Sequence, residues 1–103
     1  MLRTLEPSTF IKSGQPTVFE LRDDNPDGYP YWVEQKNKAK AIWFGKDTSN
    51  WKIGFISLLG SDESEIQGPH GKDEYPTMIG SGWKYKAEGI WHDAEPSEIN
   101  FRG

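Results

Sequence analysis

The stretch WKYKAEGIWH at residues 83–92 predicts a β-hairpin. Its first half, residues 83–86, alternates aromatic with charged residues, which is the period-two pattern of a half-buried strand, and its second half, residues 90–92, is rich in residues that favour strands. Gly89 suits the last position of a three-residue loop, because that position requires a positive φ angle. If Lys86 pairs with Ile90, aromatic cross-strand contacts stabilise the hairpin. The side chains that then share one face are Trp83, Tyr85 and Trp91.

Before this hairpin and after it, similar short segments recur between frequent glycines and prolines. Gly (11 residues) and Pro (7 residues) are poor helix formers, and aromatic residues make up 14% of the chain. We therefore expect an all-β fold, a single antiparallel sandwich or small barrel of about six strands. The expected core aromatics are Trp51, Phe55, Trp83, Tyr85 and Trp91. The other expected strands cover residues 17–21, 29–34, 39–44, 51–56 and 98–101.

The strand expected at residues 51–56 contains a glycine. Gly54 lies between Ile53 and Phe55 and has no side chain to pack. A glycine inside a strand often marks a place where another group comes close. We therefore expect Gly54 to admit a neighbouring aromatic ring or another segment of backbone.

The chain of 103 residues is long enough for one domain with its own core. We expect an N-terminal arm over residues 1–12 and a single tryptophan-rich β domain over residues 13–103. Residues 60–82 lack periodicity and carry several carboxylates, which predicts one long acidic surface loop. Ile66, Met78 and Ile79 are its expected anchors.

Composition excludes several classes of function. The net charge of −4 argues against nucleic-acid binding, which needs a basic face. The apolar runs are far shorter than the roughly 20 residues that cross a bilayer, so we expect no membrane insertion. The N-terminal residues do not resemble a signal peptide. The location is left open by the sequence, and the absence of cysteine weakly favours an intracellular one.

Glycine, proline and aromatic landmarks recur along the chain, from Gly14, Pro16 and Phe19 through the run Trp51 to Gly54 to Trp83, Tyr85 and Trp91. Their order resembles a class of small tryptophan-rich β modules found in eukaryotic proteins. These modules open on a glycine–proline–aromatic motif, contain a central W-x-I-G and close on W-x-aromatic followed by a further tryptophan. Members often carry cysteines and occur in tandem, whereas this chain has no cysteine. The resemblance implies the β fold and no established activity. In this sequence it rests on Gly14, Pro16, Phe19, Trp32, the run Trp51 to Gly54, Trp83, Tyr85, Trp91 and Phe101.

One stretch matches the calcium-loop pattern D-x-[DN]-x-[DN]-G-x5-E. Oxygen ligands at alternating positions and a final carboxylate suit calcium. The flanking residues predict strands instead of helices, and Pro30 occupies a position that normally pairs with a second loop. The alternatives are therefore a plain turn or a weak calcium site in a β-loop. The ligands in the second case are Asp23, Asn25, Asp27 and Glu34.

The residues suggest binding more than catalysis. His70 and His92 are far apart in sequence, and no nucleophile motif accompanies either one. We therefore expect that the chain is not an enzyme and that it needs no cofactor, with a weakly bound calcium ion as the one alternative. A small enzyme using His92 remains the alternative from another class.

Two strands are apolar on both sides, and one of their faces could present an aromatic platform. We expect a non-catalytic interaction module that docks a protein partner through this platform, through the acidic loop, or both. A glycan stacked on exposed rings is the alternative ligand. The platform residues are Trp32, Trp43, Tyr29 and Tyr31.

Two charged segments complete the sequence pattern. Lys36, Lys38 and Lys40 alternate and could line one side of an extended segment, either as protection of an edge or as a contact for an anionic surface. The acidic group at residues 62–65 is expected to be solvated or to dock a basic partner.

Overall fold

A computed structural model describes residues 4–7, 18–22, 29–35, 38–61, 63–71, 76–95 and 101–102. The described residues form nine strands and two 3₁₀ turns, and none of their helical turns is long enough to cross a membrane. The turns are η1 (Ile56–Leu58) and η2 (Pro76–Met78). The strands are β1 (Thr4–Pro7), β2 (Phe19–Arg22), β3 (Tyr31–Glu34), β4 (Lys40–Gly45), β5 (Asn50–Phe55), β6 (Ile66–Gln67), β7 (Lys84–Ala87), β8 (Ile90–Asp93) and β9 (Phe101–Arg102).

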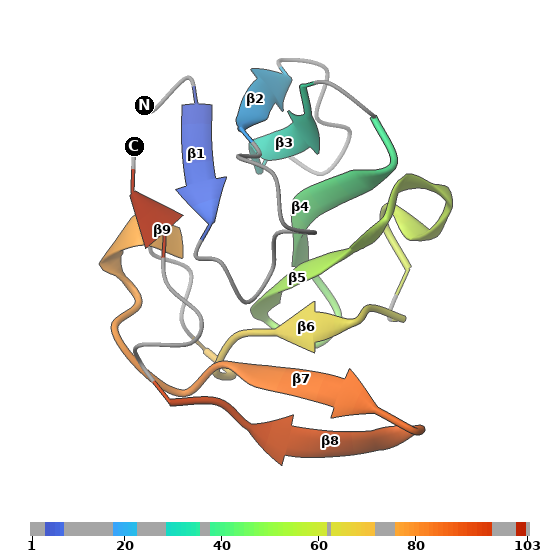
Figure 1. Ribbon diagram of the computed structural model, residues 1–103, viewed down its shortest axis with the longest axis vertical. Helices are drawn as coiled ribbons and strands as arrows, with labels where there is room; N and C mark the ends of the chain where they lie inside the picture. Colours follow the sequence, from blue (N-terminus) through green and yellow to red (C-terminus); the bar gives the residue numbers. More distant parts are fainter. Residues whose placement is uncertain are drawn as a thin grey trace.

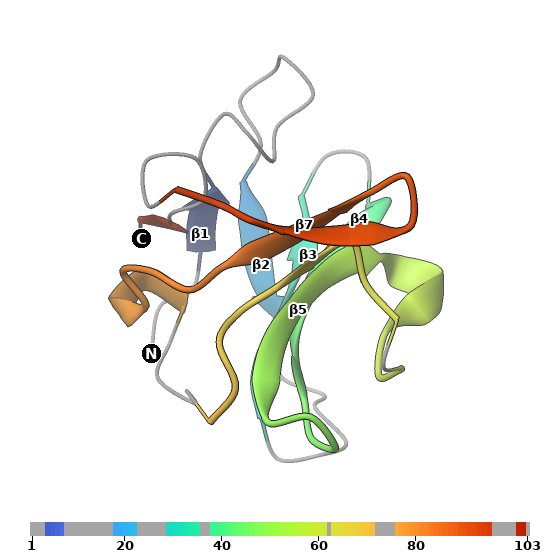
Figure 2. The same ribbon diagram turned by 90° about the horizontal axis from the view of Figure 1, so that it is seen from below.

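All strands belong to one antiparallel sheet (Figure 1). The eight strands β1 to β8 pair in chain order as a meander, and β9 returns to lie beside β1. The prediction of an all-β fold is confirmed. The sandwich or small barrel is replaced by a single curled sheet whose end strands, β8 and β9, do not pair. Figure 2 shows how strongly β4 and β5 bend within it.

The concave face of this sheet carries the main core. Eleven residues pack there, and cross-strand register keeps those that belong to strands on one face. The rings of Trp32 and Trp51 lie 5.7 Å apart, and Phe44 meets Trp51 edge-on at 5.4 Å. Aromatic pairs at such distances stabilise beyond the area that they bury. The eleven are Phe19, Leu21, Trp32, Ile42, Phe44, Trp51, Ile53, Ile66, Ile79, Trp83 and Phe101.

The core also joins segments far apart in the chain. The Trp83 ring, just before β7, lies 5.3 Å from the Phe101 ring of β9. The Trp83 indole N–H also donates to the carbonyl of Ile79 at 3.2 Å. The curled sheet therefore brings its β9 end against the start of β7 without a hydrogen-bonded seam.

The N-terminal arm and the acidic loop contain structure that periodicity did not indicate. Thr4–Pro7 of the arm forms β1. The segment 60–82 holds β6 and η2, so the prediction of a structureless loop is wrong for these residues. Ile66 and Ile79 are buried as expected, whereas Met78 is 71% exposed. β6 and η2, with two and three residues, are too short to show a period. β1 has four residues but ends on Pro7, and proline is a poor signal for a strand.

The closing strand is only partly described. It was expected over residues 98–101, and of these only Phe101 lies among the described residues, where it begins β9. Phe101 is buried in the concave core. The end of the expected strand is thus confirmed, and residues 98–100 lie outside the described part of the chain.

The hairpin exists, but its register differs by one position. Ala87 pairs with Ile90, so the loop has two residues. Both loop residues have positive φ angles, 53° at Glu88 and 77° at Gly89. Two-residue turns of this kind match the twist of the flanking strands, which explains the tighter connection. Tyr85 consequently lies opposite His92. Trp91 lies opposite Lys86 on the other face and is only half-buried, so the prediction that it belongs to the core is wrong.

Two further expectations about aromatic side chains are corrected. Phe55, placed in the core from its alternation with Ile53, is 50% exposed because it ends β5 beyond the packed region. Trp32 and Trp43, expected on an exposed platform, are 0% and 3% exposed. Trp32 is covered because it belongs to the main core, and Trp43 is covered because it belongs to a second cluster with Val33 and Ala41.

This burial predicts the response of tryptophan fluorescence to iodide. Only Trp91 is part-exposed, so we expect iodide to quench a minority of the emission and Trp91→Phe to abolish that fraction. Stern–Volmer analysis of the native protein and the variant measures it. Substantial iodide quenching that survives in the variant would contradict the burial described here. The four buried indoles belong to Trp32, Trp43, Trp51 and Trp83.

Candidate functional site

The convex face of the sheet carries a second, smaller core. Val33, Ala41 and Trp43 are buried there, with Tyr31 and Leu58 packed against them. Leu58 belongs to the connection between β5 and β6, which crosses this face. The indole N–H of Trp43 donates to the Ser61 carbonyl of the same connection at 3.4 Å. The connection thus covers strand surface that would otherwise be an exposed apolar patch.

A glycine permits this close approach. A Cβ atom at Gly54 would lie 3.3 Å from Ser64 Cα and 3.4 Å from the Trp43 ring. Ser64 is buried, and its hydroxyl has no hydrogen-bond partner among the described residues. The expectation that Gly54 admits a neighbouring aromatic ring or backbone segment is confirmed in both respects.

The covering connection leaves an open groove of about 200 Å³ beside it. Its lining residues come from β2 and β3, from the turn before β4, and from η1 with the residue after it. Ile56 and Leu59 are 40% and 37% exposed, so their apolar surface is accessible. The lining residues are Arg22, Tyr31, Val33, Lys38, Ile56 and Leu59.

The groove combines an apolar floor with two cations. Arg22 pairs with Tyr31 across β2 and β3, which places both side chains on the convex face. Lys38 sits in the β3–β4 connection at a φ angle of 54°. Within the described part of the chain, neither cation makes an ion pair. Because the chain carries a net charge of −4, two such cations on one groove oppose the overall charge.

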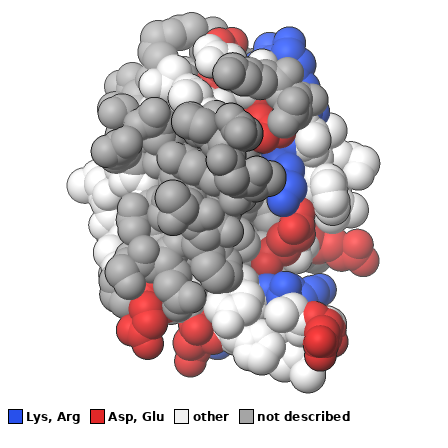
Figure 3. Space-filling model, viewed as in Figure 1, with Lys and Arg blue, Asp and Glu red and all other residues white. Residues whose placement is uncertain are grey.

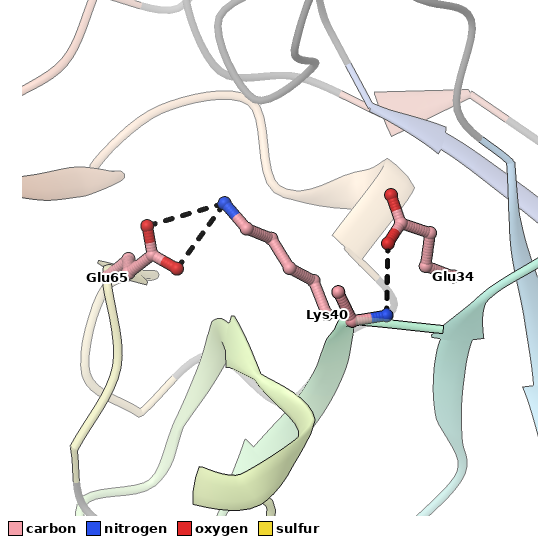
Figure 4. Close-up of polar contacts among 4 residues, drawn as sticks. Glu34, Lys40 and Glu65 are labelled. Carbon is pink, nitrogen blue, oxygen red and sulfur yellow. Dashed lines mark hydrogen bonds and ion pairs between the residues drawn. The ribbon is translucent and has the colours of Figure 1, made fainter. Parts of the chain in front are cut away.

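The neighbouring Lys40 is engaged instead (Figure 4). Its ammonium lies 3.4 Å from each carboxylate oxygen of Glu65 and 5.4 Å from the centroid of the Phe55 ring. The predicted basic run and acidic group therefore meet in one ion pair. Lys36 and Asp62 lie outside the described residues. On the face seen in Figure 3, described acidic and basic side chains alternate down the right-hand side.

The four predicted platform residues are dispersed. Trp32 points into the concave core, and Trp43 packs on the convex face under the β5–β6 connection. Tyr29 stacks on Phe44 with the ring centroids 4.3 Å apart. Tyr31 alone of the four lines the groove. Successive residues of a strand point to opposite faces, so the four could not share one surface.

The calcium prediction stays a prediction. Asp23, Asn25 and Asp27 lie outside the described residues. Glu34, the fourth expected ligand, is buried and accepts a hydrogen bond from the Ala39 amide at 3.2 Å (Figure 4). This hydrogen bond stabilises the turn between β3 and β4. The part of the chain that the structure describes contains no group of three metal-ligating side chains.

The two histidines occupy separate surface positions. His70 donates from Nδ1 to the Thr48 carbonyl at 2.8 Å, which links the segment after β6 to the β4–β5 turn. His92 is exposed and stacks on Tyr85, with 5.3 Å between ring centroids. Neither histidine lines the groove, so the groove offers no general base among its described residues.

Comparison with protein-family models, with curated proteins and with solved structures found no match to this chain. The resemblance to tryptophan-rich β modules consequently stays a prediction. Sequence reasoning missed most of the groove, namely Arg22, Lys38, Ile56 and Leu59. The only signal was the apolar run at residues 56–59, which breaks the strand alternation at η1.

The packing at Gly54 predicts a selective loss of stability. Gly54→Val forces branched carbons against the Ser64 backbone and the Trp43 ring, and overpacking of this kind costs about 1–3 kcal/mol. Urea unfolding measures the change. The matched control is Gly80→Val, because a Cβ atom at Gly80 meets nothing within 4 Å. Equal stability of the two variants would mean that the connection does not press on β5.

Proposed function

We propose that this chain is a non-catalytic interaction module that docks a protein partner in the convex groove. The proposal rests on one observation: the groove has both an accessible apolar floor and two cations, and these cations make no ion pair among the described residues. Tyr31, Ile56 and Leu59 supply the floor, while Arg22 and Lys38 supply the charge.

The size of the groove favours a protein segment. Small-molecule sites usually enclose about 300–1,000 Å³ and bury most of the ligand. A groove of about 200 Å³ has room for one or two side chains of a partner. Arginine and aromatic side chains are also enriched among the residues that dominate protein–protein binding energy.

The charge of the groove selects the chemistry of the partner. Carboxylates on either side of an apolar residue complement Arg22 and Lys38, and charge complementarity mainly raises specificity and association rate. The occupant that fits is an acidic segment with one aromatic or aliphatic anchor residue. A glycan is less suited, since Tyr31 is the only aromatic ring among the described lining residues.

The test uses synthetic peptides of defined composition. A fluorescein-labelled peptide with one leucine or phenylalanine between glutamates is titrated with the protein, beside a peptide in which lysines replace the glutamates. We expect the acidic peptide to bind and the basic one to fail. In Arg22→Glu/Lys38→Glu the affinity for the acidic peptide drops about tenfold or more, since two exposed ion pairs become repulsive. Fluorescence anisotropy measures both.

The matched control is Lys46→Glu/Lys84→Glu, which makes the same charge change at two exposed lysines outside the groove. The proposal predicts that this variant binds the acidic peptide as the native protein does. If both double variants lost the same affinity for the acidic peptide, the peptide would be bound by non-specific charge attraction and not by the groove. Binding of neutral oligosaccharides with no peptide binding would favour the glycan alternative instead.

A further inference from the structure

The sheet ends in a hairpin whose outer strand has no neighbour. β8 is the last strand in the sheet order, and in the part of the chain that the structure describes no segment pairs with its outer side (Figure 1). Ile90, at the start of β8, is 62% exposed. An open edge offers backbone donors and acceptors to another strand, and folded proteins usually protect such edges.

The backbone groups available on this edge follow from the hydrogen bonds already made. The Ala94 amide donates to the Trp83 carbonyl at 2.9 Å, so the backbone of residue 94 faces β7. Alternate residues of a strand point their backbone groups the same way, so His92 also faces β7. Trp91 and Asp93 therefore direct their N–H and C=O groups outward.

A second copy of the same strand fits this edge in one two-fold register. With the symmetry axis at His92, Trp91 of each chain lies opposite Asp93 of the other, and both outward-facing residues form hydrogen-bonded pairs. An axis at Asp93 would place two aspartates opposite each other, which is unfavourable. An axis at Trp91 would place Asp93 opposite Gly89, which belongs to the turn of the other chain. Only the pair of Trp91 residues would then be hydrogen-bonded, in place of two pairs.

The side chains make the His92 register complementary in charge. The Lys86 ammonium lies 5.1 Å from the centroid of the Trp91 ring, on the face opposite the core. Asp93 is on the same face, and its side chain is 89% exposed, 3.6 Å from Lys84. Across the axis, Asp93 of one chain comes beside Trp91 of the other and thus within reach of the Lys86 that covers it. The contact occurs twice by symmetry.

We propose that β8 pairs antiparallel with β8 of a second copy, about an axis at His92, so that one sheet continues through two chains. This self-association goes beyond the proposed docking of a partner and is independent of it, because it uses none of the groove residues. Backbone hydrogen bonds at Trp91 and Asp93 and two Lys86–Asp93 contacts hold the copies together.

Cysteine cross-linking tests the register directly, since the chain has no cysteine of its own. Facing residues that are not hydrogen-bonded have Cα atoms about 4.5 Å apart, within the range that a disulfide spans. We expect His92→Cys to form a disulfide-linked dimer under mild oxidation. Ile90→Cys, on the same face, is the control: its two copies lie about 13 Å apart along the strand and should stay monomeric.

Charge reversal tests the same contact without a cross-link. In sedimentation equilibrium the native protein should approach twice the monomer mass of 11.8 kDa as its concentration rises. Asp93→Lys and Lys86→Asp should each weaken self-association at least tenfold, and the double variant should restore it. Glu88→Lys makes the same charge change as Asp93→Lys, but at the hairpin turn, and should associate like the native protein.

Three results would overturn the proposal. The first is a native protein that stays monomeric up to millimolar concentration. The second is equally fast cross-linking of the Ile90→Cys and His92→Cys variants, which would show random collision. The third is a double charge variant that associates no better than the single ones. Thermal melts of dilute samples accompany each variant, so that loss of association is separated from loss of fold.

Discussion

A single row of side chains crosses the concave face and sets the register of strands β2 to β8. Cross-strand pairing joins one residue from each strand, so that all seven side chains lie on the same face. A one-residue slip in any strand would turn its member of the row to the other face, which determines the register throughout. In order the row is Leu21, Trp32, Ile42, Ile53, Ile66, Tyr85 and His92.

The bulk of the aromatic residues in and beside this row explains the curl of the sheet. Hydrophobic residues make up only 34% of the chain, so large rings must fill most of the core. As the sheet wraps around them, Phe101 reaches Trp83 and the two ends of the sheet approach without pairing. Side chains thereby close the concave face. The outer backbone groups of β8 pair with no strand among the described residues.

The convex face follows from the same constraint. β3 and β4 carry apolar residues on both sides, so their second side needs cover that the row cannot give. The β5–β6 connection supplies it over Trp43, and Gly54 allows the contact. The cover ends before Tyr31, which leaves the groove with its two cations. The groove and the β8 edge share no residue, so a pair of chains joined at β8 would offer two grooves to a multivalent partner.

Local patterns in the sequence were enough to predict the all-β class, four of the central strands, the hairpin and the burial of Trp51 and Trp83, because alternation and turn residues act over a few neighbouring positions. They could not predict β6, which is too short to show a period, or β1, which ends on a proline; both exist through pairing with other strands. They also placed Trp32, Trp43, Phe55 and Trp91 wrongly. Whether a face of a strand is covered depends on segments elsewhere in the chain, such as the connection over Trp43. Tertiary folding alone brought Arg22, Lys38 and Leu59 to one groove and separated Lys38 from Lys40, since these residues meet through the pairing of strands and not through their spacing.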